Sequence, residues 1–225
     1  MAIKHNRAFF GIAGVAFFLA LAAASFLHAA SPKETAPKEV IQAAMEGLQP
    51  FLESIPQESM ANFGLDGRSP ARLGAPYKLY TITPAAMETY KSDAPADTLV
   101  SETSMWHFPV LVGEETKAIL VVDNIDGQWE AVSLGYPEVA AQTEAITKQW
   151  PKSRGYNPLF IAVFQASEFL FSVPEADPKS LTSIDLSAGA AANKGMGGYS
   201  RLDNVSDTLS RLRPEVRENL RSGRE

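Results

Sequence analysis

The sequence predicts an α+β fold: an antiparallel sheet built around a three-strand meander, with helices packed on one face. Residues 103 to 136 contain three runs rich in apolar residues, the first and third of which alternate along the chain, and turn residues separate the runs. This alternation indicates antiparallel strands joined by tight turns. Segments with apolar residues at helical spacing lie before and after the meander. Helices segregated in this way from an antiparallel sheet are typical of α+β domains.

Two helices are expected at the start of the domain, from residue 38 onward. Pro50 is expected to end or kink the first helix, because proline lacks an amide donor. The second is a short helix between Pro56 and Gly64, followed by a loop over Leu65 to Pro70. The first helix is predicted from one stripe of apolar residues at helical spacing, formed by Val40, Ile41, Ala44, Met45, Leu48 and Leu52.

A strand and a short helix are expected next. Residues 77 to 82 (YKLYTI) alternate and are rich in β-forming residues, so we expect a strand. Thr83 followed by Pro84 is a typical helix start, because threonine caps the amino end and proline suits the first helical position.

The meander itself carries one unusual residue, Pro109, in its first strand. Proline has no amide to donate to a strand partner, so we expect this strand to lie at a sheet edge or to carry a bulge there. The predicted strands and turns are Trp106 to Val112, a turn at Gly113, Lys117 to Val122, a turn at Asp126-Gly127, and Gln128 to Leu134.

The remainder of the chain adds a helix, one or two strands and a tail. Glu138 to Trp150 is expected to be helical, and Leu159 to Phe164 a buried strand. Residues 169 to 173 fit either a strand or a helical turn. The domain is therefore expected to span residues 38 to 184. A Gly/Ala-rich linker at 185–203 is predicted to be flexible.

The C-terminal segment, residues 204–225, has an amphipathic pattern. Leu209, Leu212, Val216 and Leu220 recur every three or four residues, and Pro214 interrupts them. A short amphipathic helix is marginal alone in water. The stripe therefore needs the domain, a partner or an anionic membrane surface to cover it.

The N-terminus has the zones of a signal peptide over residues 1–30, followed by a short polar linker at 31–37. Lys4 and Arg7 precede an uncharged apolar run over residues 8–27, and small residues follow it. This order predicts export, with the mature protein periplasmic or secreted. The alternative is that residues 8–27 stay as a membrane anchor.

Composition excludes several classes of function. The chain has no cysteine, so disulfides, thiolate metal sites and cysteine nucleophiles are absent. A net charge of −6 without a basic tract argues against nucleic-acid binding. No metal or cofactor motif is found. Asp123 to Gly127 fails the EF-hand pattern, because Val122 stands where the first carboxylate is needed.

His107 and Tyr136 are the candidate site residues. If the signal peptide is cleaved, His107 is the one histidine left in the mature chain, and it alternates with Trp106 and Phe108. We expect it to face solvent or a groove on the opposite side of the strand from these aromatic residues. Because no Gly-x-Ser-x-Gly motif is present, His107 is more simply a strand residue than a catalytic base. Both residues are possible surface contacts.

The meander resembles small exported bacterial modules of the PepSY and cystatin-like kind. The resemblance covers residues 106–136, with WHFPVLVGEE followed by KAILVVDNIDGQWEAVSLG. It implies a binding or inhibitory role outside the cytoplasm, often toward peptidases.

Two functions remain open from the sequence. The first is an exported, non-catalytic binding or accessory protein of the cell envelope, with an unknown protein or peptide partner and a possible peripheral membrane contact through the C-terminal segment. The second is an exported hydrolase that uses His107 with a serine or carboxylate not yet placed.

Overall fold

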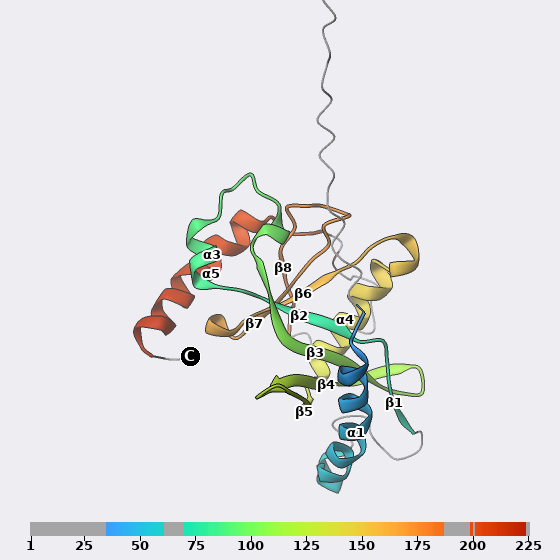
Figure 1. Cartoon of the computed structure of the whole chain (residues 1–225). Coiled ribbons are helices and arrows are strands. Elements are labelled where there is room, and N and C mark those ends of the chain that lie inside the picture. The colour runs from blue at the N-terminus through green and yellow to red at the C-terminus, as the bar shows by residue number, and fades with distance from the viewer. Residues whose placement is uncertain (1–34, 61–69, 187–198, 200, 224–225) are drawn as a thin grey trace, which may run out of the picture. The chain divides into compact units, whose positions relative to one another are not determined.

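The central strand of the sheet, β3, pairs with neighbours on both sides, and the rest of the fold is arranged around it (Figure 1). The computed structural model describes residues 35–60, 70–186, 199 and 201–223. These residues belong to a compact unit that comprises Lys33–Glu225. The expected signal peptide, the alternative anchor and most of the linker at 31–37 lie outside the described residues.

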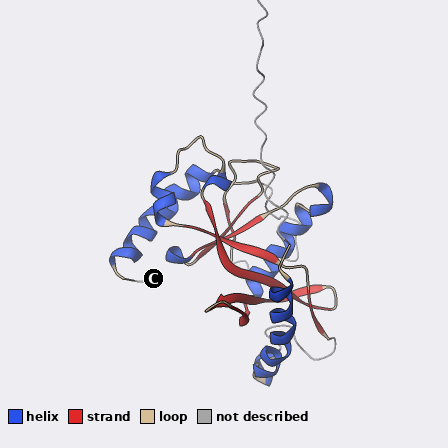
Figure 2. Ribbon diagram, viewed as in Figure 1, coloured by secondary structure: helices blue, strands red, loops and turns tan. Residues whose placement is uncertain are grey.

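The described residues contain helices and a mostly antiparallel eight-stranded sheet, which confirms the predicted α+β class (Figure 2). In chain order they are α1 Lys38–Ser54, α2 Gln57–Met60, β1 Ala71–Leu73, β2 Tyr77–Ile82, α3 Pro84–Thr89, η2 Ala96–Thr98, β3 Val100–Val112, β4 Glu115–Ile125, β5 Gln128–Gly135, α4 Pro137–Gln149, η3 Lys152–Arg154, β6 Leu159–Val163, η4 Phe164–Ala166, β7 Glu168–Ser172, β8 Thr182–Ser183 and α5 Val205–Arg221.

The strands form one eight-stranded sheet in the order β5-β4-β3-β2-β6-β7-β8, with β1 pairing to β3. All pairs are antiparallel except β2 with β6. The predicted meander is therefore present as β3, β4 and β5. Residues 168–172, which periodicity left undecided, form strand β7.

Local sequence signals account for several element ends. The Thr83 hydroxyl accepts a hydrogen bond from the Ala86 amide at 3.2 Å, which confirms the predicted cap of α3. Helix α1 continues through Pro50, and α5 continues through Pro214. Neither helix therefore ends at its proline, and in α5 the apolar side chains on both sides of Pro214 are packed in the core.

Pro109 lies in the interior of the sheet, so the prediction of an edge strand was wrong. The Pro109 carbonyl accepts a hydrogen bond from the Gly74 amide at 2.7 Å. In a strand, the N and the carbonyl of one residue point to the same side. The nitrogen of Pro109, which has no hydrogen to donate, therefore points to the break between β1 and β2. No hydrogen bond between paired strands is lost there. A bulge follows at once, between Val110 and Leu111.

Helices cover both faces of the sheet, in contrast to the single face expected. The α1 face carries Trp106 and Phe108, which pack against α1. The opposite face, here called the α4 face, carries Ile119 and Val121, which pack against Ala140 of α4. The cause is visible in β4, where five consecutive residues from Ala118 to Val122 are buried. Such a continuous apolar run is typical of a strand covered on both sides.

Helix α1 approaches β5 closely at Gly47. A Cβ atom built on Gly47 would lie 2.2 Å from the Cβ of Ala131. Glycine is therefore required at this crossing, despite its cost inside a helix.

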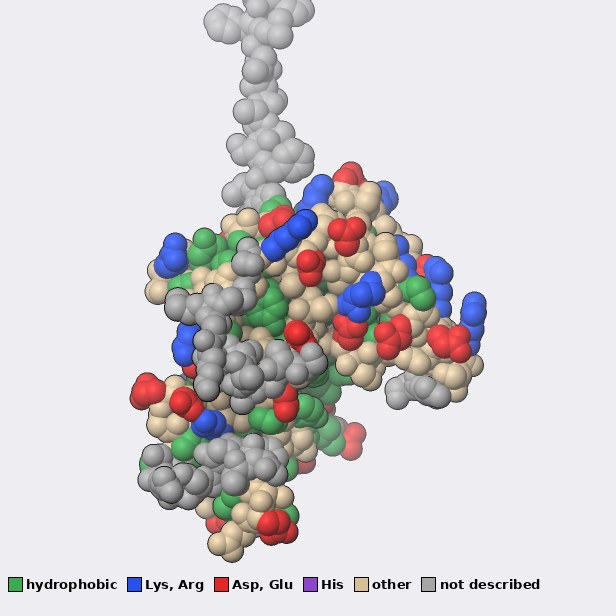
Figure 3. All heavy atoms as spheres, turned by 180° about the vertical axis from the view of Figure 1, so that it is seen from behind, with side chains coloured by type: hydrophobic (Ala, Val, Ile, Leu, Met, Phe, Trp, Pro, Cys, Tyr) green, Lys and Arg blue, Asp and Glu red, His purple; other side chains and the backbone are tan. Residues whose placement is uncertain are grey.

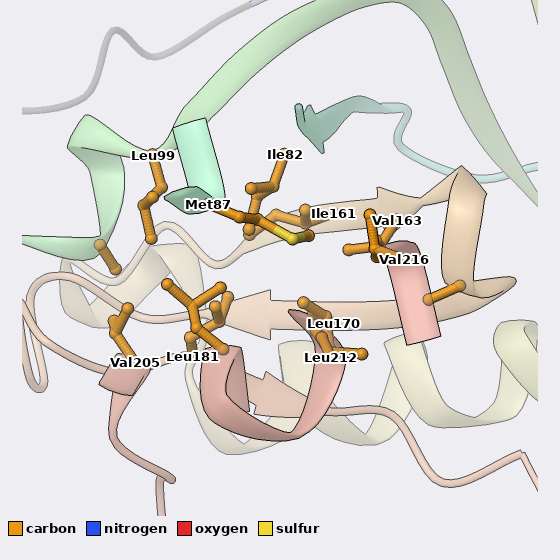
Figure 4. Packing of buried hydrophobic residues seen from close by; sticks show 13 residues of the cluster. Ile82, Met87, Leu99, Ile161, Val163, Leu170, Leu181, Val205, Leu212 and Val216 are labelled. Carbon is orange, nitrogen blue, oxygen red and sulfur yellow. The ribbon is translucent and has the colours of Figure 1, made fainter. Parts of the chain in front are cut away.

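The C-terminal helix belongs to the core, and the expected domain end at residue 184 was wrong. In Figure 4, α5 lies in front of strands β6 and β7, and its side chains point at them. Of the three surfaces that the sequence left open for the apolar stripe, the domain itself is the one observed. The buried α5 residues are Val205, Thr208, Leu209, Leu212 and Val216.

Arginines fix the outer side of α5. Arg217 makes two hydrogen bonds to the carboxylate of Glu88, at 2.8 and 2.6 Å. Arg213 donates to the Met87 carbonyl, and Arg211 pairs with Glu168. Part of the expected linker is also packed, since the ring of Tyr199 lies 4.6 Å from that of Phe171. Residues 187–198 and 200 lie outside the described residues.

Replacement of Leu209 by alanine tests this docking. Leu209 is 0% exposed, so Leu209→Ala should lower the free energy of unfolding by about 2 to 5 kcal/mol. Leu220→Ala on the same helix is the control. Its side chain is 45% exposed, and it should change stability by less than about 0.5 kcal/mol. Urea unfolding measures both, and equal effects would contradict the docked position of α5.

Candidate functional site

His107 is buried, contrary to the expectation that it faces solvent or a groove. The prediction of its side was right, since it lies on the opposite face from Trp106 and Phe108. That face is covered by α4, and His107 is 4% exposed. Its Nδ1 lies 3.3 Å from the hydroxyl oxygen of Tyr77, its cross-strand partner. Thr143 of α4 makes a further hydrogen bond with Tyr77.

Burial determines the protonation states of His107 and Tyr77. Removal from water disfavours the charged imidazolium and lowers the pKa of His107 to about 4. Burial also raises the pKa of the Tyr77 hydroxyl, because the phenolate would be charged. Both groups are neutral at pH 7. A catalytic base must reach the proton that it removes, and a buried imidazole is poorly placed to do so.

Tyr136 lies at the surface, where the sequence placed it. Its side chain is 47% exposed, and its ring centroid lies 6.5 Å from that of Phe169. The backbone of Tyr136 has φ 59° and ψ 50°, in the left-handed region, immediately before the first turn of α4. A bulky residue pays about 1 to 2 kcal/mol for this conformation, so the ring is held at the surface at a cost to stability.

The sheet opens between β3 and β4. Strands β3 and β4 pair from Val112↔Glu115 to Trp106↔Val122 and then stop pairing, although both strands continue. On β3, the residues before Trp106 pair with β2 alone. On β4, the residues after Val122 pair with β5 alone. Figure 1 shows β3 turning away from β4 and β5. We call this point the fork, formed by residues 100–106 of β3 and 122–125 of β4.

Burial changes at the fork on both strands. Residues 106–108 and 118–122 are buried, whereas Ser101, Glu102 and Ser104 on one arm are exposed, as is Ile125 on the other. The Met105 amide donates to the Thr103 hydroxyl at 3.1 Å, so a side chain supplies its acceptor. Each arm therefore has one strand edge without a partner strand in the described part of the chain.

Trp106 marks the base of the fork. Its side chain is 1% exposed, and its indole N–H has no hydrogen-bond acceptor. A buried donor without an acceptor costs about 1 to 3 kcal/mol. The ammonium group of Lys78 lies 4.9 Å from the centre of the ring and 3.9 Å from a carboxylate oxygen of Glu102.

The arms of the fork are acidic. Segments 100–106 and 122–133 contain Glu102, Asp123, Asp126 and Glu130, and neither segment has a lysine or arginine. Asp123 and Glu130 are direct cross-strand partners. Like charges in this position are destabilising. Elsewhere the charges are mixed, and Figure 3 shows acidic, basic and hydrophobic side chains interspersed on the rear surface.

A hollow with a volume of about 240 Å³ lies beside α3. Its polar groups are engaged within the protein. Tyr90 donates to the Ala94 carbonyl at 2.6 Å, and the Thr98 hydroxyl donates to the Pro95 carbonyl at 2.6 Å. The hollow offers a ligand little beyond Lys91 at its rim.

Among the described residues, no three His, Cys, Asp or Glu side chains are grouped so as to hold a metal ion. No helix within residues 35–60 and 70–223, leaving out the undescribed positions, has the length and apolar character needed to cross a bilayer.

Comparisons of the chain with protein-family models, with curated proteins and with solved structures found no match. The resemblance to PepSY and cystatin-like modules therefore stays a prediction. The fork was not predicted either. Its one sequence signal is the polar residues that stand before Trp106 on β3 and after Val122 on β4.

The buried histidine predicts a pH dependence of stability. The folded pKa of about 4 lies below the ordinary value of 6.5, so the unfolded chain binds more protons between these pH values. The free energy of unfolding should therefore fall as pH drops from 6.5 toward 4, by on the order of 3 kcal/mol from this group.

His107→Gln removes the titration while keeping a polar side chain beside Tyr77. Urea unfolding at pH 7, 6, 5 and 4.5 should show a flatter pH dependence for the variant than for the wild type. Carboxylates titrate in both proteins, so the difference between the two curves isolates His107. Parallel curves would contradict the burial of a neutral imidazole at this position.

Proposed function

We propose that this protein is a non-catalytic binding module that acts outside the cytoplasm and takes apolar segments of other polypeptides at the fork. The observation that carries the proposal is the loss of pairing between β3 and β4, which leaves strand edges without a partner strand in the described part of the chain. Unpaired strand edges attract other chains, and proteins usually shorten or cover them. At the β8 end of the sheet, the last strand has only two residues, and Ser180 forms a bridge to Asn204.

The position of Tyr136 supports the proposal. Tyrosine is enriched where proteins bind one another, because its ring combines a large apolar surface with a polar tip. Here the ring is kept exposed by a strained backbone. Strained residues cluster at functional sites, where the surrounding structure holds them in place.

The arrangement of His107 gives no support to the hydrolase alternative. Its described polar neighbour is Tyr77, linked in turn to Thr143, and all three lie between the sheet and α4. Acyl transfer needs a nucleophile and an oxyanion site that a substrate can reach. The export that the N-terminal zones predict remains part of the proposal.

Replacement of Tyr136 by asparagine tests the binding role. Asparagine tolerates the left-handed conformation, so Tyr136→Asn should keep or slightly raise the melting temperature while it removes the ring. The wild-type protein, immobilised, should enrich a subset of apolar peptides from a phage-displayed library of random 12-residue peptides. The variant should lose that enrichment by at least about tenfold, a change of about 1.4 kcal/mol in binding free energy.

Met45→Asn is the matched control. Met45 lies on α1, which packs on the opposite face of the sheet, and is 64% exposed. This variant should enrich the same peptides as the wild type. Absence of any enrichment by the wild type, or equal enrichment by Tyr136→Asn, would refute a binding role at the fork.

A further inference from the structure

The free edges at the fork are long enough to take a strand. Residues 100–102 of β3 pair on one side with β2, through Ile82↔Val100, Thr81↔Ser101 and Tyr80↔Glu102, and the register shifts between there and Trp106. On the other side, residues 100–105 have no partner strand among the described residues. The regularly paired residues 100–102 extend over about 10 Å, and strands as short as three residues occur in sheets. On the facing arm, residues 123–125 of β4 are likewise paired on one side alone.

The side chains around the fork favour one kind of strand. On the α4 face, Met105 lies partly buried and packs against two groups of buried residues, one that includes Leu79 and Phe160 and one that includes Ile119 and Val121. These surfaces suit apolar side chains. An added strand presents alternate side chains to each face of the sheet, so every second residue of a bound segment would meet the same face.

The charges favour basic residues in the same strand. Asp123 and Glu130 stand opposite each other on the α4 face, and Glu102 is 63% exposed on the arm of β3. A cation placed beside the Asp123–Glu130 pair would relieve the repulsion between the two carboxylates. An acidic segment would add to that repulsion.

We infer that the fork binds an extended peptide segment rich in apolar and basic residues, which adds as a strand to the free edge of β3. This inference rests on the proposed function and specifies its ligand and its mode of binding. Backbone hydrogen bonds supply affinity in such strand addition, and the side-chain surfaces supply selectivity. The partner is thus a segment of another polypeptide in extended form.

Three synthetic decapeptides test the mode of binding with the purified protein. The first alternates valine and lysine, the second is the same peptide with alternate amides N-methylated, and the third alternates valine and glutamate. Isothermal titration calorimetry should show binding of the first. The other two should bind at least tenfold more weakly, because one lacks amide donors and the other carries the wrong charge.

Hydrogen exchange supplies a readout of position. Amides of residues 100–105 should exchange more slowly when the valine–lysine peptide is bound, whereas those of Leu170 and Phe171 in β7, which are paired with both β6 and β8, should not change. The double variant Asp123→Asn/Glu130→Gln should bind this peptide at least tenfold more weakly. It should unfold at the same or a higher temperature, because the like-charge pair is gone, so its loss of binding cannot come from unfolding.

The outcomes separate this inference from the proposed function. Equal affinity for the N-methylated peptide, or unchanged exchange at residues 100–105, would overturn strand addition even if the library peptides still bind. Equal affinity for the glutamate peptide would overturn the charge preference. Failure of the wild-type protein to enrich any library peptide would instead refute the proposed function itself.

Discussion

The pairing of β3 with β4, covered by helices on both faces, is the constraint on which the rest of the structure depends. Trp106 and Phe108 face α1, while His107 between them faces α4. A strand buried on both sides cannot place any of its residues in solvent, whatever their polarity. The one polar residue in this stretch is therefore neutral and paired with Tyr77, since burial without a hydrogen bond would cost more.

The fork follows from the extent of that cover. Before Trp106 on β3 and after Val122 on β4 most residues are polar, and the burial of the two strands ends at the same level of the sheet. These residues have little apolar area to bury. Strand β3 therefore stays paired with β2 beside one core, and β4 stays paired with β5 beside the other. The first core joins α3 and α5 to β2, β6 and β7, and the second joins α1 to the meander. Helix α4 contacts both groups of strands from the opposite face.

This division gives a physical reason for an open edge in an otherwise well-packed sheet. Each group of strands is stabilised by its own core, so the protein does not need β3 and β4 to pair along their whole length. The energetic signs of the open region are the unpaired indole N–H of Trp106 and the opposed carboxylates of Asp123 and Glu130. Costs gathered at one point are typical of functional regions.

The sequence by itself determined the local elements: the strand at residues 77–82, the cap at Thr83 and the three strands of the meander, because alternation and turn chemistry act over a few neighbouring residues. It did not determine which faces were covered. The burial of His107, the place of Pro109 at a break between β1 and β2, and the docking of α5 through Leu209 depend on residues far apart in the chain. Only the tertiary structure decided these, because burial belongs to the assembled surfaces and not to any single segment.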